Sequence, residues 1–171
     1  MTRNIWKELR MVTFAMAAML AALAAQNANS RETSSEQRNR ELVARSFDAW
    51  RDGTGSPYDL LAEDAAWTIT GNSLAAKLYP DKEAFMREVI RPFNARMSSR
   101  LVPTVRRLYA EGDTVIAFFD AKGTARDGEP YANTYAWILE MKDGRIVKAH
   151  AFFDSIVFDA LWRRVSPAVI Q

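Results

Sequence analysis

The second half of the chain alternates apolar and polar residues in four stretches that are separated by turn sequences. The stretches are Arg100–Tyr109, Thr114–Ala125, Pro130–Met141 and Arg145–Phe153. The last two are rich in aromatic and β-branched residues and are joined by Lys142-Asp143-Gly144, in which Asp-Gly adopts positive φ at little cost. Four strands joined by short turns predict an antiparallel meander.

The first half has helical periodicity instead. Val43, Phe47 and Trp50 recur at helical spacing after Ser34 and Gln37, which fit a capping box. Ser56-Pro57 is typical of a helix start, and we expect a short second helix from there to about Glu63.

A strand and two more helices complete the pattern. Ala66–Thr70 alternates as a strand does, and Asp81 is expected to cap a third helix that Pro92 ends or kinks. Ser155 is expected to cap a last helix over Ile156–Val165. The order predicts an α+β fold in which helices pack on one face of a curved antiparallel sheet and form a cone, which is either filled with side chains or holds a ligand.

The N-terminus has the build of a secretory signal peptide. A basic start precedes an uncharged run of 15 residues, Met11–Ala25, which ends on small residues. We therefore predict a signal peptide over 1–25, a flexible leader over 26–35 and one domain over 36–171. An uncleaved anchor and an ordinary buried helix remain the alternatives. Cleavage implies a periplasmic or secreted protein with no stable membrane insertion after processing.

Removal of residues 1–25 changes the charge of the chain. They contain three of the 23 basic and one of the 21 acidic residues, so 20 of each remain. A formally neutral domain gives no indication of nucleic-acid binding. The chain has no Cys and a single His, so no metal site is expected. It has no phosphate loop and no nucleotide fingerprint, and no cofactor is expected.

Several short motifs stand out along the chain: Leu60-Leu61-Ala62-Glu63-Asp64, Arg126-Asp127-Gly128-Glu129-Pro130-Tyr131, Asn133-x-Tyr135-x-Trp137, Asp143-Gly144-Arg145-Ile146 and Phe152-Phe153-Asp154. Together they resemble the nuclear-transport-factor-2-like superfamily (NTF2-like, a cystatin-like roll), in particular its SnoaL-like and ketosteroid-isomerase-like branch. The resemblance covers roughly residues 36 to 165. It implies the cone fold, which hosts isomerases, hydrolases, cyclases and binding modules.

The catalytic residues of two branches are mostly replaced at the matching positions. Those of the ketosteroid isomerases correspond to Ser46, Ile69 and Trp137. Those of the limonene-epoxide hydrolases correspond to Trp67, Ile69, Phe118, Asp120 and Ala151, of which Asp120 alone is retained. The resemblance therefore argues against either of these mechanisms.

Alternation along one strand groups Asn133, Tyr135 and Trp137, with Tyr131, on one face. By resemblance this face lines the cone, where an amide, a phenol and an indole can orient a ligand; the alternative is that they satisfy one another in a filled core. The resemblance also turns inward three aromatic residues, Trp67, Phe118 and Phe153. These six residues are the predicted ligand-binding set.

Three residues are candidates for acid–base chemistry. Asp120 lies on an apolar strand, where burial would raise its pKa, unless it pairs with Lys122 or with Arg106 or Arg107. Asp154 stands before the last helix and can act on substrate or cap the helix. His150 lies ~13 Å from Asp154 along a regular strand, too far for a dyad, and is expected on the outer face.

Two functions remain open. One is an exported, cofactor-free isomerase, hydratase or hydrolase acting on a small lipophilic molecule. The other is a non-catalytic binding module for a lipophilic ligand or protein partner. The outer strand face carries small apolar residues, Ala132, Thr134, Ala136 and Ile138. Because such a face is seldom left in water, we expect a homodimer through it.

Overall fold

The computed structural model describes residues 34–168. The chain divides into two units, residues 1–35 and 36–171. The predicted signal peptide and nearly all of the predicted leader lie outside the described residues. The fold described below is that of the second unit.

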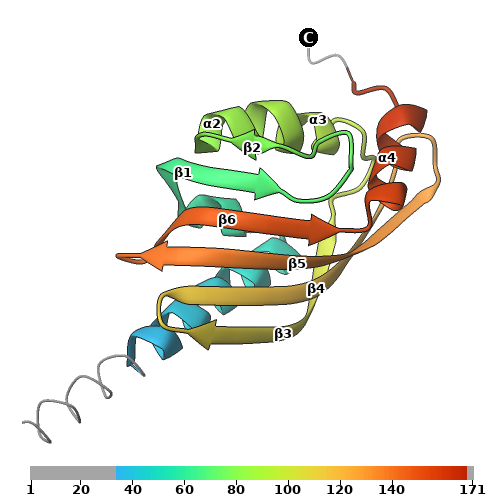
Figure 1. Ribbon diagram of the computed structural model, residues 1–171. Helices are drawn as coiled ribbons and strands as arrows, with labels where there is room; N and C mark the ends of the chain where they lie inside the picture. The colour runs from blue at the N-terminus through green and yellow to red at the C-terminus, as the bar shows by residue number, and fades with distance from the viewer. Residues whose placement is uncertain (1–33, 169–171) are drawn as a thin grey trace, which may run out of the picture. The chain divides into compact units, whose positions relative to one another are not determined.

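Six strands form one curved sheet (Figure 1). They are β1 (Leu61–Ile69), β2 (Leu78–Tyr79), β3 (Val102–Glu111), β4 (Thr114–Thr124), β5 (Pro130–Lys142) and β6 (Arg145–Phe153), in the spatial order β2-β1-β6-β5-β4-β3. The meander β3–β6 is antiparallel as predicted. The α+β fold with a curved sheet packed against helices is confirmed, and the sheet is mixed rather than purely antiparallel, because β1 runs parallel to β6. No tight turn joins these two strands, so nothing local imposes an antiparallel direction.

The turn between β5 and β6 confirms the hairpin that Asp-Gly predicted. Asp143 has φ 50° and Gly144 has φ 76°. Positive φ at both central residues belongs to the primed turns, whose twist matches that of the flanking strands. The turn sets the register as far as Met141, and an irregularity between Met141 and Glu140 shifts it so that Trp137 lies opposite Ala151.

The first helix covers residues 36–52 of this unit, and Gly53 follows it with φ 76°, which is typical of a glycine just past a helix end. The second helix is shorter than predicted. It is a single 3-10 turn, η1 (Pro57–Leu60), because the chain enters β1 already at Leu61.

The third helix consists of α2 (Lys82–Phe85), the π-helical segment η2 (Met86–Ile90) and α3 (Arg91–Asn94). Asp81 caps it as predicted, and its carboxylate accepts from the Ala84 N–H at 2.7 Å. Pro92 does not end this helix. The π-helical segment changes the hydrogen-bond register just before Pro92, whose nitrogen has no proton to donate. The helix therefore continues through Pro92.

The last helix is α4 (Ser155–Arg164). Its cap is Asp154 rather than Ser155, since the Asp154 carboxylate accepts from the N–H groups of Ile156 and Val157 at 2.9 and 3.3 Å. The expectation for Ser155 is therefore wrong by one residue.

The first helix and the α2–α3 helix pack against the same face of the sheet. Phe47 contacts Phe119 of β4 edge-on at 4.8 Å, and Phe85 stacks on Trp67 of β1 at 4.4 Å. In the described residues, the core therefore lies between one sheet face and these helices, with α4 closing one end through Phe158.

Candidate functional site

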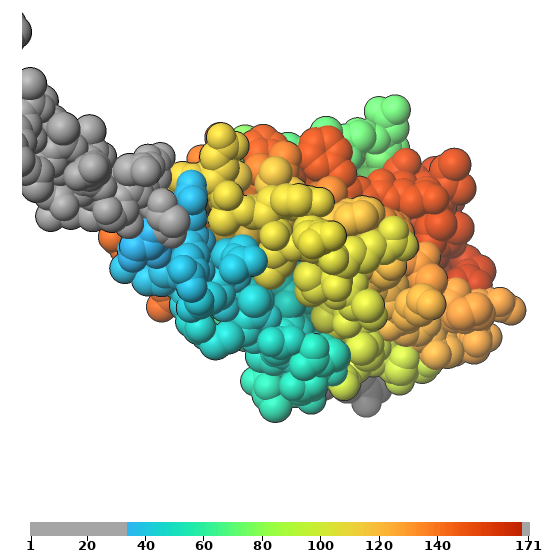
Figure 2. All heavy atoms as spheres, turned by 90° about the horizontal axis from the view of Figure 1, so that it is seen from below, coloured from blue at the N-terminus to red at the C-terminus, as the bar shows by residue number. Residues whose placement is uncertain are grey.

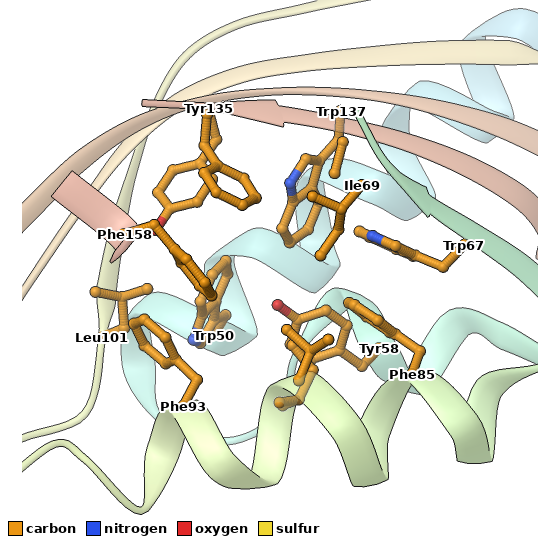
Figure 3. A pocket seen from close by; sticks show the side chains of 14 residues that line it. Trp50, Tyr58, Trp67, Ile69, Phe85, Phe93, Leu101, Tyr135, Trp137 and Phe158 are labelled. Atoms are coloured by element: carbon orange, nitrogen blue, oxygen red, sulfur yellow. The ribbon is translucent and has the colours of Figure 1, made fainter. Parts of the chain in front are cut away.

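An apolar cavity of about 50 Å³, called here the chamber, lies between the sheet and the helices (Figure 3). The sheet contributes Trp67, Ile69, Tyr135, Trp137, Ala151 and Phe153. The helices and their connections contribute Trp50, Tyr58, Phe85, Val89, Ile90, Phe93, Leu101 and Phe158. None of these residues is an Asp, Glu, His, Lys or Arg.

Aromatic rings fill most of the space inside the cone. Trp137 meets Trp67 nearly perpendicularly with 5.1 Å between ring centroids, and meets Phe119 at 4.8 Å. Trp50 lies nearly parallel to Trp137 at 6.0 Å. Edge-to-face and offset contacts of this kind hold rings in fixed orientations. The chamber is thus a small residual space with rigid walls.

A larger opening of about 470 Å³, called here the cleft, adjoins the chamber. The two cavities share Trp50, Tyr58, Ile90, Phe93 and Leu101. The rest of the cleft is more polar and is lined by Ser56, Met86, Asn94, Met97, Ser98, Ser99 and Arg100. Figure 2 shows the teal end of the first helix and η1 beside the yellow-green residues that follow α3, and the cleft lies between these segments.

Two phenol groups supply polar atoms to the chamber. The Tyr58 hydroxyl points into the space beside Trp50 and Trp137 (Figure 3). Burial raises the pKa of Tyr58 and raises the pKa of Tyr135 well above its ordinary value. Both groups are therefore neutral at physiological pH. The Tyr58 hydroxyl can donate a hydrogen bond into the chamber, whereas the Tyr135 hydroxyl already pairs with the Tyr131 hydroxyl at 2.9 Å.

The indole N–H of Trp67 is buried and has no hydrogen-bond partner among the described residues. Its ring is perpendicular to that of Trp137, a geometry in which an N–H can interact with a π face. A buried N–H donor without an oxygen acceptor is uncommon in a protein interior. Here it reflects the apolar side chains that surround the chamber.

Four of the six predicted ligand-binding residues line the chamber, namely Trp67, Tyr135, Trp137 and Phe153. Asn133 faces the same side of β5 but does not reach the chamber. Its amide donates to the Asp154 carbonyl at 3.0 Å and to the Tyr131 hydroxyl at 3.1 Å, and its oxygen accepts from the Asp154 N–H at 3.0 Å. Asn133 thus ties β5 to the start of α4, as the filled-core alternative expects.

Phe118 was expected to face inward, and that orientation is wrong. For Asp120 the expected burial is wrong, and the alternative of an ion pair with Arg106 is the one that the structure shows. The buried residues of β4 are Val115, Ala117, Phe119 and Ala121, so Phe118 and Asp120 lie on the outer face. The Asp120 carboxylate accepts from the Thr134 hydroxyl at 2.7 Å and from Arg106 Nε at 2.6 Å. These bonds lower its pKa, whereas a buried catalytic carboxyl would have a raised one.

The other two acid–base candidates also lie away from the chamber. The Asp154 carboxylate caps α4, and with Asp120 it lines a shallow outer depression of about 370 Å³. His150 pairs with Ile138 of β5 and with Thr68 of β1 on the outer face, as expected. The structure brings the two carboxylates near one surface depression and brings none of the three groups to the apolar cavity.

Sequence reasoning missed the side chains that the helices bring to the chamber. Phe85, Val89 and Phe93 form the apolar stripe of the third helix, and Trp50 ends the stripe of the first. The periodicity shows that these residues are buried, but not which sheet residues they meet. Tyr58 follows Ser56-Pro57 directly, and that turn signal could have located it at the cavity wall.

Among residues 34–168, no helix has the length and hydropathy needed to cross a membrane. The same part of the chain holds no group of three or more His, Cys, Asp or Glu side chains placed to bind a metal ion.

Residues 43–149 match the family model of the SnoaL-like domain. A curated relative, the uncharacterized protein YesE of Bacillus subtilis, is 37% identical over 67 residues, which are 39% of this chain and 45% of that protein. The chain thus spans about half of the length of this relative.

Solved structures share the fold at low sequence identity. Bal32a, from a soil-derived mobile gene cassette, superposes with a TM-score of 0.62 at 22% identity, covering 75% of this chain and 99% of that one. An NTF2-like protein from Burkholderia thailandensis gives 0.59 at 23% identity, with 72% and 95% covered. A putative isomerase from Bacillus subtilis gives 0.58 at 20% identity, with 80% and 99% covered. At this identity the likeness establishes the NTF2-like fold.

Proposed function

The chain belongs to the SnoaL-like domain family, and we propose that this member binds a small, largely apolar molecule without catalysing a reaction on it. The observation that carries the proposal is the composition of the chamber wall, whose fourteen residues include no carboxylate, imidazole, ammonium or guanidinium group. A general base at neutral pH is most often an imidazole or a carboxylate within hydrogen-bond reach of the reacting atom, whereas the two phenols of the wall are protonated.

The sizes of the two cavities indicate how a ligand fits. A chamber of about 50 Å³ is too small for a whole ligand, since ligand sites usually measure about 300–1,000 Å³. The adjoining cleft, at about 470 Å³, lies in that range. We infer that the body of the ligand occupies the cleft and that one apolar end, such as a ring edge, enters the chamber.

The catalytic alternative depends on the phenols. The neutral Tyr58 hydroxyl can donate to a carbonyl oxygen and stabilise negative charge that develops there, while the Tyr135 hydroxyl is paired with that of Tyr131. Proton abstraction also needs a base, and the three candidate bases lie on the other side of the sheet. The phenols therefore favour recognition of a carbonyl or hydroxyl group in the ligand.

Binding can be measured with simple aromatic probes. We expect phenylacetamide, 3-phenylpropanamide or 4-phenylbutanamide to quench tryptophan fluorescence saturably, because Trp50, Trp67 and Trp137 line the site. Ala151→Leu adds a larger side chain to the chamber wall and should weaken binding by about tenfold, corresponding to about 1.4 kcal/mol. Ala132→Leu, on the exposed face of β5, is the matched control and should bind as the unmodified protein does.

Catalysis is tested by proton exchange. A ketone probe such as 4-phenyl-2-butanone, incubated with the protein in D₂O, should exchange its α protons no faster than with the Ala151→Leu variant. Exchange that depends on an open chamber would overturn the non-catalytic proposal. Equal affinity of the Ala151→Leu and Ala132→Leu variants for the amides would show that the chamber is not the binding site.

Export is a separate part of the proposal. It is supported by the uncharged run that ends on small residues at Ala25. Protein recovered from the periplasm or the medium should begin near Ala25 or Gln26 by N-terminal sequencing. Recovery of folded protein that retains Met1 from the membrane fraction would contradict cleavage.

A further inference from the structure

Among the described residues that line the cleft, Arg100 is the one that carries a charge. Its side chain is exposed, and it makes no ion pair with a carboxylate in the part of the chain that the structure describes. Many other surface arginines do pair, for example Arg91 with Glu83 and Arg106 with Asp120. A cation without a counterion at the opening of an apolar cavity is available to an anion.

The guanidinium group is held in a fixed place. Nη1 of Arg100 donates to the Trp50 carbonyl oxygen at 2.8 Å, at the end of the first helix. Gly53 leaves room for it, since a Cβ at that position would lie 3.3 Å from the guanidinium carbon. One nitrogen of the planar guanidinium group is thus bound to the backbone. The remaining N–H groups can form two parallel hydrogen bonds with a carboxylate.

The surroundings add donors and no competing acid. Ser99 lines the cleft and its oxygen accepts from the Thr124 N–H at 2.8 Å, which leaves its hydroxyl proton free to donate. The carboxylate of Asp59, on the adjoining η1 turn, accepts from the Ser56 N–H at 2.7 Å and does not line the cleft. The cleft therefore offers positive charge and hydrogen-bond donors beside an uncharged aromatic wall.

We propose that the ligand of this domain carries a carboxylate at one end, which binds Arg100 in the cleft while its apolar end enters the chamber. The ligand class is then an aryl or cyclic carboxylic acid. This inference rests on the proposed function, because it names the polar end of the same ligand.

The test compares each phenylalkanamide with the acid of the same shape: phenylacetate, 3-phenylpropanoate and 4-phenylbutanoate. Isothermal titration calorimetry at pH 7 should give at least one acid with an affinity about tenfold higher than that of its amide, as expected for a charge-assisted hydrogen bond. Raising the salt concentration from about 0.05 to about 0.5 M should weaken binding of the acid and leave the amide unchanged, because salt screens an exposed ion pair.

Two substitutions locate the charge. Arg100→Gln should reduce the acid-to-amide affinity ratio to about one and leave amide affinity within about twofold, while Arg100→Lys, which keeps the charge but not the paired contact, should give an intermediate ratio. Arg106→Gln, on the outer face, removes an equal charge far from the cleft and should preserve the ratio.

Arg100 also satisfies a carbonyl at a helix end, and a purely structural role makes a different prediction. Arg100→Gln would then lower the thermal midpoint and leave the acid-to-amide ratio unchanged, which would overturn the inference. Equal binding of acids and amides by the unmodified protein would also overturn it and leave the proposed function standing. If no acid and no amide binds, the proposed function itself fails.

Discussion

The two faces of the sheet differ in the chemistry that they hold. On the inner face, β5 presents Tyr131, Asn133, Tyr135, Trp137, Leu139 and Met141, all buried. On the outer face, the neighbouring strands carry ion pairs, Arg106 with Asp120 and Lys148 with Glu140. The three acid–base candidates Asp120, His150 and Asp154 lie on the outer side of the sheet, and the chamber lies on the inner side.

This separation bears on how function is assigned in a fold that serves many functions. A cone-shaped fold provides a cavity, whereas catalysis requires an ionisable group inside it. Asp120 keeps the residue type of a catalytic position in one related branch, yet its carboxylate is bound by Thr134 and Arg106 outside the cone. Residue identity at a matching position is thus a weak guide to role unless the direction of the side chain is known.

The largest difference between the inner and outer faces of the sheet is expected at two adjacent residues of β4. Phe119 is fully buried and Phe118 lies on the outer face. Phe119→Ala should lower the free energy of unfolding by about 3–5 kcal/mol, because it removes a core ring and leaves a cavity. Phe118→Ala should cost about 1 kcal/mol or less, mostly through its contact with the Arg106 guanidinium.

Urea denaturation of both variants measures the difference. Equal losses would mean that the two sides of β4 are not as distinct as the buried and exposed residues indicate. A larger loss for Phe118→Ala than for Phe119→Ala would reverse the assigned faces.

The same comparison shows how far the sequence predicts the fold. The meander followed from turn chemistry, because Asp143-Gly144 and Gly128 mark the ends of strands whatever lies around them. The sequence did not predict which face of β4 is buried, because apolar residues occupy both alternating sets of positions. Ile116 and Phe118 belong to one set, and Val115 and Phe119 belong to the other. The charges of Asp120 and Lys122 share the parity of Phe118 and could have placed it outside.

Of the residues that form the candidate site, the sequence predicted only those that the sheet contributes. Strand alternation places Tyr135 and Trp137 on one face, and the structure confirms that both line the chamber. Phe85 and Phe93 reach the same chamber from a helix whose docking on the sheet depends on contacts distant in sequence. The position of Arg100 at the cleft depends on the path of the loop after α3, and no local sequence pattern specifies that path.

A second test concerns the buried amide on the inner face. Asn133→Ala leaves both the Asp154 N–H and the Tyr131 hydroxyl without their amide partner. We expect a loss of about 2 kcal/mol in the free energy of unfolding, as is usual when buried polar groups lose partners. Thr134→Ala, the next residue on the outer face, should cost about 1 kcal/mol or less. Equal thermal shifts for the two variants would contradict a structural role for Asn133.

A third test concerns what covers the outer face. Ala132, Thr134, Ala136 and Ile138 lie there as expected, with Ile116 and Phe152 also partly exposed. We propose that two copies of the chain associate through this face, since exposed apolar patches commonly mark interfaces. Ile138→Lys should weaken association by about tenfold or more, or about 1.4 kcal/mol, as measured by sedimentation equilibrium. A monomeric mass for the unmodified protein at micromolar concentration would exclude this interface.

The smallest effect is expected at the outer-face carboxylate. Hydrogen bonds from Thr134 and from Arg106 lower the pKa of Asp120 below its ordinary value of 3.8. A carboxyl whose pKa is lower in the folded state stabilises the fold above its unfolded pKa, and this contribution disappears as the pH falls through the folded value. Asp120→Asn should therefore cost less than about 1 kcal/mol at pH 7, because the pair lies at the surface, and the difference should shrink below about pH 4. Asp64→Asn, exposed on β1, is the control for removal of a surface carboxylate. Urea denaturation of the three proteins between pH 7 and pH 3 measures this difference in the free energy of unfolding.

A buried acid or base with a raised pKa would give the opposite sign, because its carboxylate form would destabilise the fold at neutral pH. A more stable Asp120→Asn variant at pH 7 would therefore return Asp120 to the list of candidate catalytic groups.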